Sequence, residues 1–368
     1  MKIPFFNYPG IFEQRREEYL SVLEDVMTRG AFIMQKDLDE FEENLAKMLD
    51  VDHAIGVADG TMALILSLKA SELNSGDEVI VSAHTFIASA AAINHVGAIP
   101  VLADIGEDHL IDPNSIKRLI SKKTKAIMPV QLNGRISKMD EINQIAQEFD
   151  LKIIEDSCQA LGATYKGKFA GTFGTAGSFS FFPAKTLGCF GDGGAVVTNS
   201  AAIAKKIKML RDHGRDLEDG KVKFYGYNAR LDNIQAAVLN LKLRYYEDEI
   251  SRRREIASMY DSLLSNLSEL VLPPPPKENS SHYDVYQNYE IQAHSRDELK
   301  LYLEKNGVGT IIQWGGYSLN NFDDIGLKKN LKNTDLLFSK FLMLPMHSML
   351  KNEEVEYISR YVKKFYES

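Results

Sequence analysis

One lysine lies between an aromatic stretch and a glycine-rich turn in residues 177–194, and its amine could do covalent chemistry. Pro183 interrupts the β-like run just before Lys185, and Gly188 and Gly191 free the backbone just after it. A lysine in a shaped, water-poor site can lose its proton near neutral pH and act as a Schiff-base nucleophile. The alternative is a surface lysine at the junction of a strand and a loop.

Two acids follow an apolar run some thirty residues upstream. Ile153 and Ile154 are typical of a buried parallel strand, and Glu155 and Asp156 come at its C-terminal end. Open α/β sheets hold their ligands at that end of the strands. A carboxylate there could hold the protonated ring nitrogen of pyridoxal phosphate and keep the ring an electron sink. The alternative is a helix N-cap, which Asp156 or Ser157 could supply.

The first part of the chain predicts the scaffold that would position these groups. Strands are expected at 53–58, 78–81, 99–104 and 125–130, with helical stretches between them. Strands and helices that alternate at this spacing predict a parallel, doubly wound α/β sheet.

The second part of the chain predicts a smaller α+β unit. A long helix is expected from Ile234 toward Leu270, and the four prolines 273–276 then form a stiff linker. Strands are expected at 286–291 and 308–312, with a helix at 297–305 between them.

The turn after the first expected strand is a candidate anion site. Gly60 and Thr61 begin a helix there, where unpaired N–H groups and the positive end of the helix dipole favour a phosphate. Asp59 precedes them and is an anion itself, so we expect it either to point away or to cap the helix.

Together these blocks resemble the DegT/DnrJ/EryC1/StrS family of sugar aminotransferases, pyridoxal phosphate (PLP) enzymes of the aspartate aminotransferase fold (fold type I). The resemblance covers roughly residues 3–365 and is most specific around Lys185, at 155–160 and at 226–237. It implies an α/β large domain with a mostly parallel seven-stranded sheet flanked by helices. A smaller C-terminal α+β domain would complete the fold, with the two domains at residues 1–246 and 247–368.

The family resemblance also implies roles for individual residues. Lys185 would bind the cofactor covalently and then move a proton, while Asp156 holds the ring nitrogen. The other implied cofactor contacts are Gly60, Thr61, Phe86, Gln159, Ser180 and Asn228. Asn228 would reach the cofactor of a neighbouring subunit, which implies a homodimer with shared active sites; its alternative is a turn residue.

Four residues are candidates for substrate binding, and one position departs from the family. Gln313 and Trp314 replace a family segment, and Trp314 could be a sugar-stacking wall or a core anchor. His347 lies in a segment similar to one near the family's active site. Arg29 could meet a phosphate or carboxylate, or lie solvated at a helix end. Gln131 replaces a common family His and can hydrogen-bond but not do acid–base work.

The implied function is amino transfer from an amino acid, expected to be L-glutamate, to a keto group of a nucleotide-linked 6-deoxy hexose. A 4-keto acceptor is favoured over a 3-keto one, for surface polysaccharide (O-antigen or lipopolysaccharide) or glycosylated metabolites. Lys185 argues against the subgroup that replaces this lysine by histidine and dehydrates its sugar. The alternatives are another fold type I enzyme, such as a lyase or desulfurase, and a non-catalytic PLP-binding regulator.

Composition bounds the remaining possibilities. The chain has 368 residues, which suits two domains, and a net charge of −8, which makes nucleic acid an unexpected partner. Its two cysteines form no disulfide framework, no signal peptide pattern begins the chain, and no apolar run reaches the length of a membrane span. We expect a soluble, cytoplasmic protein without a metal site.

Overall fold

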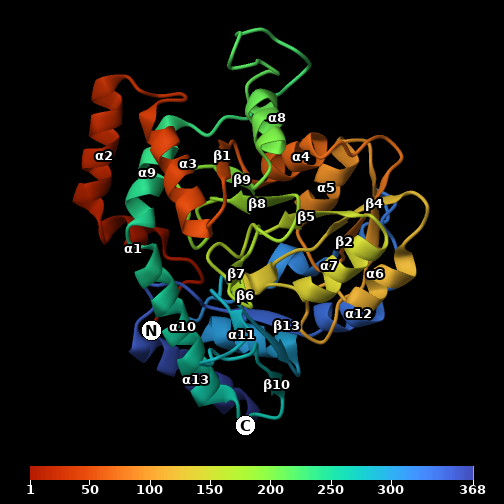
Figure 1. The fold of residues 1–368 in the computed structure, drawn as a ribbon. Coiled ribbons are helices and arrows are strands. Elements are labelled where there is room, and N and C mark those ends of the chain that lie inside the picture. The colour runs from red at the N-terminus through yellow and green to blue at the C-terminus, as the bar shows by residue number, and fades with distance from the viewer. Residues whose placement is uncertain (368) are drawn as a thin grey trace.

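The computed structural model describes residues 1–367, and a seven-stranded sheet forms the centre of its larger part (Figure 1). The strand order is β1-β9-β8-β5-β4-β2-β3. The strands are β1 (His53–Val57), β2 (Glu78–Ser82), β3 (Ile99–Ala103), β4 (Thr124–Met128), β5 (Lys152–Asp156), β8 (Ala176–Ser180) and β9 (Gly194–Thr198). Strand β9 runs antiparallel to β1 and β8, while β3, β2, β4, β5 and β8 pair in parallel. The expected α/β fold with a mostly parallel sheet is confirmed.

Helices cover both faces of this sheet because its strands are apolar on both sides. Within β5, Ile153 packs in one core cluster and Ile154 in another. One face is covered by α4 (Gly60–Ala70), α5 (Ile87–His95) and α8 (Ala201–Arg211). The other face is covered by α3 (Lys36–Leu49), α6 (Pro113–Leu119), α7 (Met139–Glu148) and α9 (Asn233–Leu243). Two further helices, α1 (Tyr8–Glu13) and α2 (Arg16–Arg29), precede them.

The C-terminal part has a core of its own around a three-stranded antiparallel sheet, β10-β12-β13. Its elements are α10 (Tyr246–Leu264), β10 (Leu270–Val271), β12 (Tyr289–Ala293), α11 (Arg296–Lys305), α12 (Lys332–Phe338), β13 (Phe341–Leu344) and α13 (Asn352–Glu367). The N-terminus lies beside this part (Figure 1), and Ile3 packs into its core. A small sheet, β11-β6-β7, joins β11 (His282–Tyr283) to β6 (Thr164–Tyr165) and β7 (Lys168–Phe169).

The long helix expected from Ile234 toward Leu270 is wrong, because the chain breaks between α9 and α10 at Arg244 and Tyr245. Leu239 on α9 packs in the large core, whereas Tyr260 on α10 packs in the C-terminal core. The break at Arg244 and Tyr245 therefore lies between the helix that packs in the large core and the helix that packs in the C-terminal core.

Two strand predictions for the C-terminal part also need correction. No strand forms at 308–312, where only isolated bridges join Val308 to Ile3 and Ile311 to Met343. The strand expected from Tyr286 begins at Tyr289 instead, because Tyr286 has a left-handed φ of 48° that a strand does not accept.

None of the helices within residues 1–367 is both long and apolar enough to cross a membrane.

Candidate active site

Lys185 lies in the turn between β8 and β9, and this turn is fixed by backbone hydrogen bonds. The Lys185 N–H donates to the carbonyl of Phe182 at 2.8 Å, and the Cys189 N–H donates to that of Phe181 at 2.8 Å. A Cβ at position 188 would lie 2.6 Å from the carbonyl oxygen of Pro183, so only glycine allows this close return of the chain. Burial lowers the pKa of the Lys185 amine below its usual value, although nearby Cys158 and Asp156 oppose the shift.

Asp156 ends β5, and its buried carboxylate is held by two donors. The Ser89 hydroxyl donates to Oδ2 at 2.7 Å, and the Cys158 N–H donates to Oδ1 at 3.2 Å. Ser89 comes from α5 and is itself 2.8 Å from the Thr85 hydroxyl. The carboxylate is therefore oriented from two elements and keeps lone pairs for a further donor, such as a protonated ring nitrogen.

Gln159 follows β5, and the orientation of its amide is set by its neighbours. Its Oε1 accepts the Asn133 backbone N–H at 2.9 Å and the Asn288 Nδ2 at 3.3 Å. Both partners are donors, so Oε1 faces them and the Nε2 donors are left for another acceptor. A phenolic oxygen is such an acceptor.

The anion site expected at Gly60 and Thr61 lies at the start of α4, beside the end of β8. A Cβ on Gly60 would lie 2.8 Å from Ser180 Cβ and 3.0 Å from Cys158 Sγ, so the residue must be small. Asp59 is the N-cap, and its Oδ1 accepts the Met62 N–H at 2.8 Å. Of the two alternatives for Asp59, helix capping is the one observed, and it leaves the earlier N–H groups facing the end of β8.

The residues predicted to stack on the cofactor ring or to bind the sugar form a second group of contacts, around Trp314. Phe86 is the N-cap residue of α5, is 52% exposed, and has its ring 6.4 Å from that of Trp314. Trp314 is half-buried and packs against Phe338 and His84. Gln313 is buried beside it. These contacts give Trp314 a packing role, and its role as a sugar-stacking wall stays a prediction.

Of the remaining predicted residues, His347 shares a cavity with Lys185, whereas Arg29 and Asn228 lie in other parts of the structure. Lys185 and His347 both line a cavity of about 280 Å³, and burial followed by the charge of Arg253 lowers the pKa of His347. Arg29 is bound by Asp25 and by both oxygens of Asp37, which joins the end of α2 to α3.

Asn228 is exposed in the segment between α8 and α9, where it bridges to Asp212.

Gln131, which replaces a common family His, has a structural explanation in its hydrogen bonds. Its Nε2 donates to Glu155 at 2.9 Å, and its Oε1 accepts the Ser137 N–H at 2.7 Å. Glu155 also accepts N–H groups from residues 171, 173 and 174. Gln131 thus makes a hydrogen bond, which joins the segment after β4 to β5, and the other bonds of Glu155 join β5 to the segment before β8.

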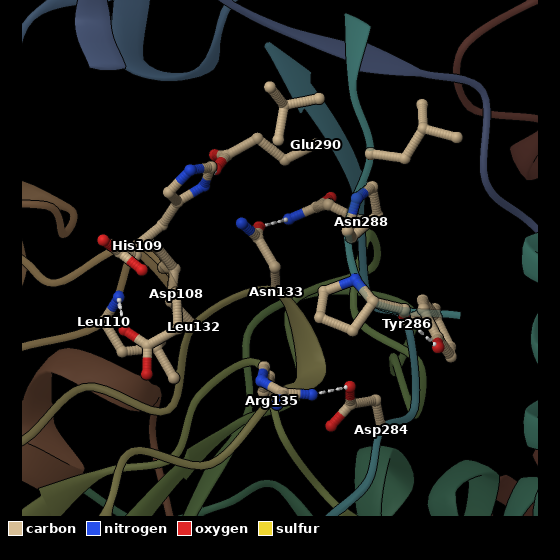
Figure 2. Close-up of a pocket in the computed structure, with 15 residues that line it drawn as sticks. Asp108, His109, Leu110, Leu132, Asn133, Arg135, Asp284, Tyr286, Asn288 and Glu290 are labelled. Carbon is tan, nitrogen blue, oxygen red and sulfur yellow. Dashed lines mark hydrogen bonds and ion pairs between the residues drawn. The ribbon is translucent and has the colours of Figure 1, made fainter. Parts of the chain in front are cut away.

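Several residues around the site were not predicted by the sequence analysis. Ser89 is a single hydroxyl in a helix of alanines, a signal that could have been noticed. Asn133 and Asn288 had no such signal, because their side chains meet only in three dimensions. Figure 2 shows these two side chains pointing toward one another across a pocket of about 160 Å³, joined at 2.8 Å.

The fold and this arrangement of an amine, a carboxylate and an amide define the class of protein as a fold type I PLP enzyme. Residues 13–363 match the DegT/DnrJ/EryC1/StrS aminotransferase family, and the chain belongs to it. It is a nucleotide-sugar aminotransferase whose cofactor is PLP.

Individual relatives are similar over their full lengths. A pleiotropic regulatory protein of Geobacillus stearothermophilus is 36% identical, with 100% of this chain and 99% of the relative covered. The dTDP-3-amino-3,6-dideoxy-alpha-D-galactopyranose transaminase of Aneurinibacillus thermoaerophilus is 35% identical, with 99% of each covered. A crystal structure of S. venezuelae DesV in complex with a ketimine intermediate superposes with a TM-score of 0.95 at 32% identity, covering 100% of this chain and 99% of that one.

The residues present fit PLP. A buried amine lies in the turn after β8, an oriented carboxylate ends β5, and a glycine cradle begins α4. The Nε2 donors of Gln159, which are free because its Oε1 faces the other partners, suit the phenolic oxygen of the cofactor.

Proposed function

We propose that the protein transfers an amino group from L-glutamate to a keto group of a nucleotide-linked 6-deoxy hexose. The observation that carries this proposal is the buried Lys185 amine beside Asp156 at the carboxyl edge of the sheet. PLP, when bound, supplies an electrophilic carbonyl carbon and an electron sink.

Each residue has a defined task in this proposal. Lys185 supplies an amine whose pKa is lowered by burial, and its Nζ would carry the proton between carbon atoms. Asp156 holds the ring nitrogen, Gln159 donates from Nε2 to the phenolic oxygen, and Phe86 covers the ring. Gly60, Thr61 and Ser180 hold the phosphate at the start of α4.

The relative from Aneurinibacillus thermoaerophilus bears on the position of amination. Its name carries the amino group at C3, so we propose a 3-keto acceptor as the first substrate to test. The 4-keto preference from the sequence is the competing prediction. Products of either kind would serve surface polysaccharide, including O-antigen or lipopolysaccharide, or glycosylated metabolites.

The cysteines bear on the desulfurase-like alternative, which needs a thiolate on an accessible loop. Cys189 is buried, and burial raises the pKa of its thiol to about 12. Burial also raises the pKa of Cys158 well above its usual value. Thiols that stay protonated at neutral pH are poor nucleophiles, which favours amino transfer.

The direct test is a panel of nucleotide-linked 3-keto and 4-keto hexoses incubated with glutamate and the PLP-loaded enzyme. Mass spectrometry would detect the amino sugar, and NMR would locate the amine on the ring. We expect a 3-amino product. An amine at C4 would overturn the proposed position, and a panel without any amino sugar would overturn the acceptor class.

A further inference from the structure

Gln287 makes two hydrogen bonds that bracket Lys185. Its Oε1 accepts the N–H of Thr186 at 2.8 Å, and its Nε2 donates to the carbonyl of Ala184 at 2.8 Å. The side chain is buried, with 5% of the residue exposed. One amide therefore binds the backbone on each side of the lysine.

The orientation of this amide is determined by its partners. A backbone N–H can only donate and a carbonyl can only accept, so the oxygen must face Thr186 and the nitrogen must face Ala184. Both bonds hold the turn from outside its own sequence, across 101 and 103 residues.

The next residue, Asn288, holds the other side of the cofactor site. Its Nδ2 donates to Asn133 Oδ1 at 2.8 Å and to Gln159 Oε1 at 3.3 Å, and Figure 2 shows the contact with Asn133. Gln287 and Asn288 therefore contact two different elements of the site from adjacent positions just before β12.

The segment that carries these two amides is firmly anchored. Arg253 of α10 is buried, and its Nη1 donates to the carbonyls of Tyr286 and Gln287 at 3.1 and 3.2 Å. A Cβ on Gly134 would lie 2.6 Å from the Tyr286 nitrogen, so this segment packs closely against the loop after β4. A fixed segment can transmit its position to the groups that it binds.

We infer that Gln287 and Asn288 are positioning residues, which set the Lys185 turn and the Gln159 amide from one rigid segment of the C-terminal part. This inference rests on the proposed roles of Lys185 and Gln159. Neither amide takes part in proton transfer. Their effect is on where the lysine amine and the Gln159 donors lie, and a displacement of such groups by about 1 Å can cost on the order of 100-fold in rate.

The test compares three variants of the PLP-loaded enzyme. Gln287→Met removes both hydrogen bonds while it fills the space, and Asn288→Leu removes the donor to Gln159. Gln292→Met is the matched control, because Gln292 lies on β12, the strand that follows Asn288, and bonds to His109 instead. The readouts are kcat, KM for each substrate, the pH midpoint of the visible absorbance, the Kd for PLP and the thermal midpoint.

For Gln287→Met we expect kcat to fall about 10- to 100-fold with little change in KM, and the absorbance midpoint to move away from that of the control. Asn288→Leu should raise the Kd for PLP. If Gln287→Met does not fold, Asn288→Leu still tests the positioning role of Asn288. Variants that match the control in kcat, absorbance midpoint and Kd, or that lose only thermal stability, would overturn it.

Reduction of the wild type with borohydride, followed by peptide mass spectrometry, separates this inference from the function beneath it. PLP found on a lysine other than Lys185 would overturn the proposed site. PLP found on Lys185, together with a normal Gln287→Met variant, would overturn the positioning role alone.

Discussion

Lys185 is half-buried and Asp156 is buried, and the protein prepares each in a different way. The lysine loses hydration, which lowers its pKa and favours the free amine. The aspartate instead gains two fixed donors, the Ser89 hydroxyl and the Cys158 N–H. One group is thus made reactive and the other is held still, as a nucleophile and a ring-nitrogen partner require.

Replacing the lysine should remove covalent cofactor attachment without unfolding the protein. For Lys185→Ala and Lys185→Arg we expect no visible band from lysine-bound PLP and no turnover, because neither side chain offers a nucleophilic amine. Absorbance spectra and circular dichroism check the two parts. A purified Lys185→Ala protein that transaminates normally would contradict the assignment.

Removing the charge of the aspartate should slow the reaction while PLP still binds. We expect Asp156→Asn to lose at least ~100-fold in rate, since an amide cannot keep the ring nitrogen protonated; carboxylate-to-amide changes at orienting acids cost this much or more. Steady-state kinetics provide the measurement. A near wild-type rate would mean that the ring-nitrogen partner lies elsewhere.

Ser89→Ala tests the support of that carboxylate. The loss should be smaller than for Asp156→Asn, because the Cys158 N–H still holds Oδ1 while Oδ2 loses its donor. Thr85→Ala is the control, since Thr85 contacts Ser89 and has no direct bond to the carboxylate. Equal rates for Ser89→Ala and the wild type would show that the orientation of Asp156 does not depend on this bond.

Among the elements, β11 offers a test of stability against pH. The His282 ring lies 4.6 Å from that of Tyr165, and its Nε2 lies 3.1 Å from the carbonyl of Ile136. Burial, followed by the positive charge of Arg135, lowers the pKa of His282 to about 4. In the unfolded chain the pKa is about 6.5, so between these values the unfolded state binds more protons and stability falls as pH falls.

We therefore expect the thermal midpoint of the wild type to fall more steeply from pH 6.5 toward pH 4 than that of His282→Gln. Above pH 6.5 the His282 contribution is fully present and the slopes should agree. His95→Gln, at an exposed position, is the matched control and should follow the wild type. Identical slopes for all three proteins would contradict the assignment.

The elements that the sequence predicted are those whose signals are local. Strand β5 with its terminal Asp156, and the turn around Lys185, are short patterns of apolar, acidic, proline and glycine residues. The break between α9 and α10 could not be predicted, because no proline or glycine marks it at Arg244 and Tyr245. The contacts of Gln287 and Asn288 were equally hidden, since each joins segments more than 100 residues apart.

At the scale of the whole molecule, we propose a division of the chain after residue 246, with the first residues joined to the smaller part. Ile3 supports this addition, because its N–H donates to the Gly307 carbonyl at 2.8 Å and its side chain packs in the C-terminal core. We also propose a homodimer in which Asn228 reaches the partner's cofactor site. Its exposure in the segment between α8 and α9 is compatible with that role.

Mixing two inactive variants tests the shared site. In a mixed dimer of Lys185→Ala and Asn228→Asp, both changes fall in one site and the other site is intact, so partial activity should return after subunit exchange. The added carboxylate should repel the cofactor phosphate, so Asn228→Asp alone should bind PLP poorly. Exchange without recovery, or full activity from a single chain of 41.3 kDa in light scattering, would contradict the shared site.

The central claim is that this chain uses Lys185 to move an amino group onto a nucleotide-linked sugar. The most direct measurement supplies glutamate labelled with heavy nitrogen and a nucleotide-linked 3-keto hexose to the PLP-loaded wild type and to Lys185→Ala. With the wild type we expect the heavy nitrogen in the new amino group of the sugar. With Lys185→Ala we expect no labelled sugar. Label transfer by both proteins, or by neither while the wild type binds PLP, would contradict the claim.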